Sequence, residues 1–199
     1  MNAYLHSKLS VKRYGGKIED YYAIHSFMDS TKELCSDNRH RILHNLWGIR
    51  RVIIPIFGST IKNSSNKIVN VKDLCERDHI LPDYGNRFIP TLEDFTNAIT
   101  DESNINLKLL DNFHKQFHFE KEVMDLLLSP LTLTGNIKSL YLTHNSWFVN
   151  SIVAKIYQIN PIITNFPFSP SEIFRNMKFE LWMDNGNGYP NSSLKAKKY

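Results

Sequence analysis

The chain has little cysteine, little glycine and no long hydrophobic run, and each scarcity excludes a class of protein. Among 199 residues there are two cysteines and eight glycines. Cys35 and Cys75 stand alone, so we expect neither a disulfide framework nor a zinc ribbon, and a reducing compartment fits best. The longest apolar run, 52–57, is far shorter than the roughly 18 residues that a membrane span requires.

The first residues also lack the basic and then apolar pattern of a signal peptide. Lys and Arg number 24 against 20 Asp and Glu, and the net charge of +4 forms no dense basic stripe. There is therefore no strong signal for a nucleic-acid partner. We expect a cytoplasmic protein without a membrane partner.

Composition and periodicity favour a packed helical protein. Hydrophobic residues make up 42% of the chain, which excludes a wholly disordered one. Apolar residues at helical spacing predict helices over 3–13, 18–34, 39–54, 71–80 and 107–128. Two β-prone triplets, 60–62 and 67–69, enclose a turn-rich tetrad and predict a small hairpin. The expected fold is mainly α: a compact helical domain with one small β-hairpin, with two pseudo-symmetric halves as an option.

A four-residue motif, His-Asn-x-Trp, occurs at 44–47 and again one hundred residues later, at 144–147. Each copy opens an apolar stretch. Either the chain contains a duplication, or two unrelated helices both begin with a polar His-Asn pair. We expect residues 1–100 to form a helical, histidine-rich unit with the hairpin. Residues 101–199 would form a helical second half, a diverged copy if the repeat is real, with a loose C-terminal tail.

A set of polar identities in the first half carries a family resemblance. The matching residues are His6-x3-Ser10, Gly15-Gly16, Glu19-Asp20-Tyr21, Ile24-His25, Asp29-Ser30-x-Lys32, Asp37-x-Arg39-His40-Arg41-x2-His44, Asp78-His79-x3-Asp83-x-Gly85 and Pro90-Thr91. With these the chain resembles, over about residues 1–96, an uncharacterised family of small phage and bacterial proteins. That family has no assigned activity, so the resemblance implies no function. It implies that the second half is an extension or a diverged copy.

Histidines at helical spacing are the candidate metal ligands. His40 and His44 are four residues apart, a spacing that puts two imidazoles on one face of a helix. The pairs His25 with Asp29 and His79 with Asp83 repeat this spacing. The predicted metal ligands are His25, His40, His44, His79 and Asp83. Imidazole with carboxylate suits a divalent transition metal such as zinc, iron or manganese.

The arrangement is also loosely similar to the helical HD-type phosphohydrolases. These hold a metal with a histidine on one helix, an adjacent His-Asp pair on another and a later aspartate. The chain departs from that pattern, because its adjacent pair has the opposite order, Asp78-His79. The resemblance implies hydrolysis of a phosphate ester.

One function that fits is a metal-dependent hydrolase acting on a phosphorylated small molecule or nucleotide. The metal would lower the pKa of a bound water, and Asp29 or Glu76 would take its proton. Basic side chains would bind the anionic group. The candidate substrate-binding residues are Lys32, Arg39, Arg41 and Trp47. Trp47 fits a core anchor better than a ligand-stacking surface.

The alternative is a non-enzymatic phage accessory protein that binds a nucleotide signal or a host protein. The same histidines would then line a metal-free polar pocket, or form a purely structural hydrogen-bond network. The sequence leaves these three roles for the histidines open, and with them whether the protein is an enzyme. We expect a small anionic ligand or a host protein as the partner. The sequence does not indicate the oligomeric state.

Overall fold

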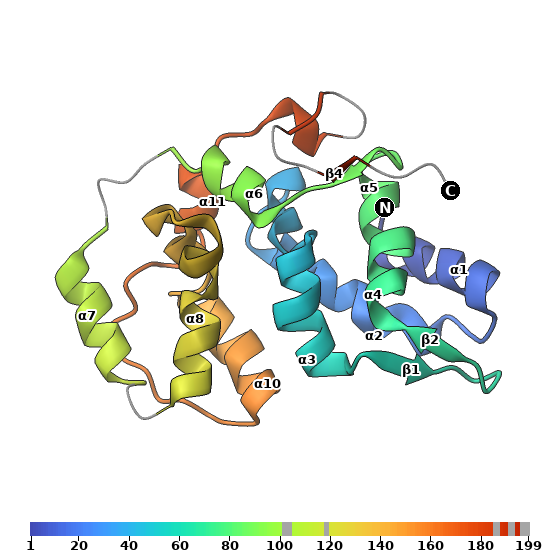
Figure 1. Ribbon diagram of the computed structural model, residues 1–199, viewed down its shortest axis with the longest axis horizontal. Helices are drawn as coiled ribbons and strands as arrows, with labels where there is room; N and C mark the ends of the chain where they lie inside the picture. Colours follow the sequence, from blue (N-terminus) through green and yellow to red (C-terminus); the bar gives the residue numbers. More distant parts are fainter. Residues whose placement is uncertain (101–104, 118–119, 185–187, 191–193, 196–199) are drawn as a thin grey trace. The chain divides into compact units, whose positions relative to one another are not determined.

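The computed structural model describes residues 1–100, 105–117, 120–184, 188–190 and 194–195 (Figure 1). The chain forms two compact units, one of residues 1–94 with 179–199 and one of residues 95–178. The chain thus enters the second unit a few residues before the predicted boundary at 100. It belongs again to the first unit from Phe179 onward. Of the tail predicted to be loose, residues 185–187, 191–193 and 196–199 lie outside the described part.

The first unit is built from short helical segments around a polar centre. Its elements are α1 (Ala3–Tyr14), α2 (Glu19–Met28), η1 (Ser30–Glu33), η2 (Asn38–Leu43), η3 (Gly48–Ile53), α3 (Ile54–Phe57), β1 (Thr60–Lys62), β2 (Ile68–Asn70), α4 (Val71–Leu74), η4 (Cys75–Ile80), α5 (Leu81–Asp83), β3 (Phe88–Ile89), η7 (Leu181–Met183) and β4 (Leu194–Lys195). Helix α6 (Leu92–Ala98) spans the boundary between the units.

The named elements of the second unit are all helical, and residues 159–166 have no regular secondary structure. Its elements are α7 (Leu107–Lys115), α8 (Lys121–Thr134), η5 (Ile137–Leu142), α9 (Ser146–Phe148), η6 (Val149–Val153), α10 (Ala154–Tyr157) and α11 (Glu172–Asn176). None of the helices in the described residues is long and apolar enough to cross a membrane.

The expected fold class, mainly helical with one small hairpin, is confirmed. Strands β1 and β2 pair antiparallel, with Ile61 opposite Val69, where the two β-prone triplets predicted a hairpin. A second short antiparallel pair joins β3 and β4. The predicted helix 107–128 is two helices, α7 and α8.

The prediction of one continuous helix over 39–54 is wrong, because the chain breaks at the His-Asn-x-Trp motif. His44 has ψ 55°, which is not helical. The Asn45 side chain accepts a hydrogen bond from the Gly48 amide (2.9 Å) and donates one to the Ile42 carbonyl (2.8 Å). It therefore begins the next helix as an N-cap. Asn145 acts in the same way: its side chain accepts from the Phe148 amide and donates to the Leu142 carbonyl (3.3 Å) and also to the Tyr141 carbonyl (2.9 Å).

Gly48 lets the two helical segments on either side of this turn approach closely. A Cβ at position 48 would lie 2.2 Å from the Leu43 carbonyl oxygen. Backbone atoms cannot move aside as a flexible side chain can, so the turn requires glycine. Trp47 lies directly before it and is buried in the core, at 5% exposure.

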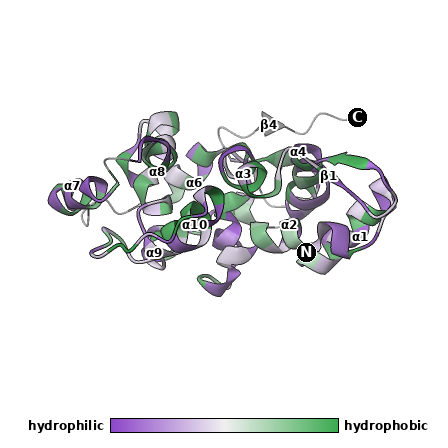
Figure 2. Cartoon of the chain, turned by 90° about the horizontal axis from the view of Figure 1, so that it is seen from below, coloured by the Kyte–Doolittle hydropathy of each residue, from purple (hydrophilic) through white to green (hydrophobic). Residues whose placement is uncertain are grey.

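Helix α1 buries a polar face instead of an apolar one. Its fully buried residues are His6, Ser7 and Ser10, whereas Tyr4 and Leu5 are exposed. Hydrophilic stretches along this helix are visible in Figure 2. Burying polar groups costs free energy unless each finds a partner, so α1 must meet polar partners inside the unit.

We expect Gly48→Ala to lower the free energy of unfolding by about 3 kcal/mol, because the new methyl group collides with the Leu43 carbonyl. The matched control is Gly135→Ala. That site has open space around it but a φ of 64°, so only backbone strain of about 1 kcal/mol is expected. Urea denaturation of both variants measures the difference. A loss at position 48 no larger than at position 135 would contradict the close approach.

Candidate metal centre

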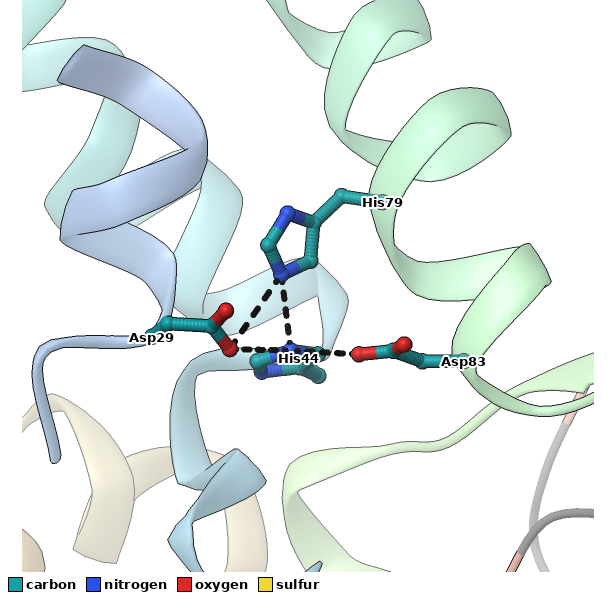
Figure 3. A group of neighbouring side chains, drawn as sticks. All are labelled: Asp29, His44, His79 and Asp83. Atoms are coloured by element: carbon teal, nitrogen blue, oxygen red, sulfur yellow. Dashed lines mark hydrogen bonds and ion pairs between the residues drawn. The ribbon is translucent and has the colours of Figure 1, made fainter. Parts of the chain in front are cut away.

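Four buried side chains converge in the first unit (Figure 3). Asp29 directly follows α2, His44 directly follows η2, His79 lies in η4, and Asp83 ends α5. Each offers one ligand atom, and the four atoms all lie within 4.8 Å of one another. Asp29 is 7% exposed and the other three are 1% exposed or less. We call these residues the four-residue cluster.

The distances within the four-residue cluster match those of ligands around an ion. Metal–nitrogen and metal–oxygen bonds of about 2.0–2.2 Å place neighbouring ligand atoms about 2.8–3.6 Å apart. His44 Nε2 lies 2.9 Å from His79 Nε2, 3.5 Å from Asp29 Oδ1 and 3.3 Å from Asp83 Oδ2. His79 Nε2 lies 3.6 Å from Asp29 Oδ1. Asp29 Oδ1 and Asp83 Oδ2 are both buried, and neither has a hydrogen-bond partner among the described residues.

Two further histidines direct a nitrogen at these carboxylates. His6 Nδ1 lies 2.7 Å from the Asp78 carbonyl oxygen and His40 Nδ1 lies 2.5 Å from that of Asp37. A carbonyl oxygen only accepts, so in both rings Nδ1 carries a proton that it donates. In the neutral ring Nε2 then holds a lone pair. His6 Nε2 lies 3.3 Å from Asp83 Oδ1.

His40 faces the other carboxylate as His6 faces Asp83: His40 Nε2 lies 3.6 Å from Asp29 Oδ1. Protonated imidazole would bond a carboxylate at about 2.7–2.9 Å. Both Nε2 atoms are instead buried and have no hydrogen-bond partner in the part of the chain that the structure describes. Each faces a carboxylate at a distance that suits a shared cation better than a shared proton.

The Asp78 carbonyl that His6 contacts lies in the π-helix η4. Pro82, four residues later, has no N–H and cannot donate to this carbonyl. His6 donates to this carbonyl from α1. Because the chain stays helical through Asp83, His79 and Asp83 remain one turn apart.

A buried hydrogen-bond chain fixes the orientation of His79. His79 Nδ1 lies 3.0 Å from His25 Nδ1, and His25 Nε2 lies 2.9 Å from Ser10 Oγ. Ser10 Oγ donates in turn to the His6 carbonyl. Protons that run in one direction satisfy every member: His79 donates to His25, His25 to Ser10, and Ser10 to the carbonyl. This leaves the His79 Nε2 lone pair pointing at the four-residue cluster.

The electrostatics favour the ionised form of both carboxylates and the neutral form of His25 and His79. Burial lowers the pKa of His79 well below its ordinary value, and it lowers the pKa of His25 to about 3. Burial alone would raise the pKa of Asp29, but interactions with His40, His44 and His79 hold that pKa below its usual range. The pKa of Asp83 is likewise lowered, because His44, His6 and Arg41 outweigh its burial. Ionised carboxylate and neutral imidazole are the protonation states that bind metals.

Positive groups line the edge of the four-residue cluster. Lys32 Nζ donates to Asp29 Oδ2 at 2.7 Å, and its side chain is 40% exposed. The N-terminal ammonium of Met1, also partly exposed, lies 2.5 Å from Asp83 Oδ1. Arg41 is buried: its Nη1 donates to the carbonyls of Asp83 and Met183, and its Nε lies 3.6 Å from Asp83 Oδ2.

The structure brings some of the predicted site residues together and leaves others apart. Four of the five predicted metal ligands, His40, His44, His79 and Asp83, lie at the centre, together with the predicted base Asp29. His25 lies behind His79. The remaining predicted residues have other partners: Glu76 pairs with Lys72, Arg39 pairs with Asp37, and Trp47 lies in the core.

His6 and Ser10 belong to the centre but were not predicted as site residues. They are four residues apart, the spacing that identified the other pairs, so the signal was present. Ser10 lacks a ligand atom of the usual kind, and its role depends on contacts with residues distant in sequence.

The second His-Asn-x-Trp copy is built similarly but lacks the donor set. His144 is fully buried, and its Nε2 lies 2.8 Å from His114 Nε2. One hundred residues after Asp29 and His40 stand Ser129 and Leu140. Among the described residues, the only group that could hold a metal ion is the four-residue cluster.

A family model described as "Domain of unknown function (DUF6915)" matches residues 1–105. This confirms the expectation of an uncharacterised family over the first half. All residues of the centre lie inside the match, whereas His114 and His144 lie outside it. No curated protein and no solved structure matches the chain. The looser similarity to HD-type phosphohydrolases therefore has no support from these comparisons.

We expect His144 to make the protein less stable in acid. Burial lowers its pKa from 6.5 to about 3, so the unfolded chain takes up the proton first as the pH falls. The stabilisation is complete above pH 6.5 and is lost toward pH 3, with about 2–3 kcal/mol lost by pH 4.5. In His144→Gln the drop in unfolding free energy between pH 7 and 4.5 should shrink by this amount, as measured by urea denaturation. Equal drops in both proteins would contradict the assignment.

Proposed function

We propose a function for this chain, which belongs to the DUF6915 family: it binds a divalent transition metal ion and uses it to hydrolyse a phosphorylated small molecule or nucleotide. The ion lies among Asp29, His44, His79 and Asp83. Zinc, iron and manganese all suit a site of imidazole and carboxylate.

One observation carries the metal site: buried carboxylate oxygens face imidazole nitrogens and have no hydrogen-bond partner. Asp29 Oδ1 and Asp83 Oδ2 are both in this position. Leaving a buried charged group unsatisfied costs about 1–3 kcal/mol or more. An ion between the carboxylates and the imidazoles would satisfy all of them at the distances observed.

The balance of charge supports an anionic substrate. Three cations, Lys32, Arg41 and the Met1 ammonium, lie beside the two carboxylates, Asp29 and Asp83. A divalent ion would bring two further positive charges, which a phosphate dianion would neutralise. Lys32 has the most exposed side chain of the three cations, so it is placed to meet a phosphate that arrives from solvent.

A bound divalent ion would supply the chemistry of phosphate-ester hydrolysis by polarising the phosphoryl oxygen and making water more acidic. The residues of the chain would position the groups. Asp29 directs one oxygen at the centre and the other at Lys32, so it is placed to accept a proton from an attacking water. Glu76 is bound to Lys72 and has no part in this proposal.

The burial of the centre favours a second candidate, a closed metal site in a non-enzymatic binding protein. Structural metal sites keep no open position, whereas catalytic sites do. At 7% exposure, Asp29 is the most exposed member of the four-residue cluster. A closed site would bind metal as tightly but would not turn over phosphate esters. This is the alternative in which the protein recognises a nucleotide signal or a host protein.

Metal analysis of the purified chain tests the site. We expect bound zinc, iron or manganese in the wild type and its loss in Asp29→Asn/Asp83→Asn, which keeps the side-chain shapes and removes both charges. His114→Gln, a histidine of the second unit, is the matched control and should keep the metal. Wild-type protein that binds none of the three ions at micromolar concentration would refute the proposal.

Phosphate release separates the two candidates. The metal-loaded chain is tested on p-nitrophenyl phosphate and a panel of nucleotides. A hydrolase should show turnover that chelation abolishes, and Lys32→Gln should raise KM without loss of metal. Full metal loading without turnover on any of these substrates would favour the closed site.

We expect Ser10→Ala to weaken metal binding about tenfold, because His25 loses its partner and no longer holds His79 in place. The matched control is Ser7→Ala. Ser7 is equally buried on α1 but bonds only within its own helix, to the Ala3 carbonyl. Competition with a fluorescent chelator measures both affinities. Equal affinities in the two variants would show that the chain of hydrogen bonds does not orient His79.

A further inference from the structure

We propose that this centre holds two metal ions, each bound by two histidines and one aspartate; the inference rests on the proposed metal binding and extends it. One ion lies among His40, His79 and Asp29, and the other among His6, His44 and Asp83. His6 and His40 thereby become ligands in addition to the four-residue cluster.

The tautomers of His6 and His40 are the first argument. A metal-bound histidine usually donates its other ring N–H to a carboxylate or a backbone carbonyl, which fixes the lone pair toward the metal. Both residues do so through Nδ1. Both are at least nine-tenths buried, and both direct an unpartnered Nε2 at a carboxylate. Histidines that only filled space would not need this arrangement.

The second argument is that the ligand atoms extend too far to surround one ion. The contacts run as a string, from His40 to Asp29 (3.6 Å), to His44 (3.5 Å), to Asp83 (3.3 Å) and to His6 (3.3 Å). Two ligand atoms on opposite sides of one ion are only about 4.2 Å apart. The set whose atoms all lie within 4.8 Å of one another includes neither end of the string. A single ion therefore leaves the two end histidines facing carboxylates unpaired.

The contacts divide the six donors evenly. Asp29 Oδ1 lies 3.6 Å from both His40 Nε2 and His79 Nε2. The Asp83 carboxylate lies 3.3 Å from both His6 Nε2 and His44 Nε2. Two histidines and one carboxylate form a facial set that binds Fe(II) and leaves positions open.

The two sets adjoin, because His44 Nε2 lies 2.9 Å from His79 Nε2 and 3.5 Å from Asp29 Oδ1. Adjoining sets are what two-metal hydrolytic sites require, since their ions lie roughly 3.5–4 Å apart. Such a pair can bind one phosphate between the ions.

The positive groups beside Asp83 are consistent with this arrangement. The Met1 ammonium lies 2.5 Å from Asp83 Oδ1, where the second ion would bind. Its residue is partly exposed, so it can move into solvent when an ion enters. Arg41 approaches the other oxygen, Oδ2, and its Nη1 is held by two backbone carbonyls.

Manganese loading of the full chain tests the proposal. We expect two Mn²⁺ ions per chain by metal analysis, with an exchange-coupled electron paramagnetic resonance spectrum. One ion per chain with the simple hyperfine sextet of isolated Mn²⁺ would overturn the two-ion centre and leave the proposed single site standing. Protein that binds no metal would overturn both proposals.

Variants at the two ends assign the ligands. His6→Gln and His40→Gln should each bind one ion in place of two and lose the coupled spectrum, and His114→Gln should keep both. Circular dichroism reports whether each variant folds. If an end variant fails to fold, the wild-type stoichiometry and spectrum still decide. Two ions retained in both folded end variants would contradict the assignment.

Discussion

The burial of two carboxylates among four imidazoles is the constraint on which the first unit depends. Asp29 and Asp83 are ionised inside the protein, where an unbalanced charge is costly. Four histidines turn toward them: His6 from α1, His40 from η2, His44 directly after η2, and His79 from η4. The helices of this unit are mostly short, and α1, η2 and η4 all contribute side chains to this polar centre. An apolar core alone would not explain why α1 packs with His6, Ser7 and Ser10 inward.

The sequence predicted the helical class and the hairpin, because periodicity and turn residues act locally. It also predicted most of the centre, because residues four apart, such as His79 and Asp83, lie on the same face of a helix. It misjudged the segment 39–54, where a buried asparagine cap and a glycine contact end one helix and begin another. His6 and Ser10 were missed because their roles arise only when α1 packs beside η4. Glu76 and Arg39 were predicted from residue type alone, and each forms an ion pair with a residue close to it in sequence.

Within the repeated motif, the asparagine has a structural role in both copies, whereas the histidine belongs to the candidate site in the first copy only. Asn45 and Asn145 make the same turn in both units, whereas only His44 lies among carboxylates. His144 meets His114 instead, in a place where burial keeps it neutral. The turn does not depend on the site, and a histidine placed by it can serve either purpose. This is why the motif pointed to the centre without revealing what it does.

The polar inner face of α1 has a consequence for the order of assembly. A helix with little apolar surface gains little from hydrophobic collapse, so its docking waits until Asp78, His25 and Asp83 are already in place. We expect α1 to join last during folding and to detach first, and faster amide hydrogen exchange in α1 than in α2 would reveal it. Equal protection of both helices would refute this order. Because α1 carries one proposed ligand, His6, its detachment would also withdraw that ligand and expose the centre to solvent.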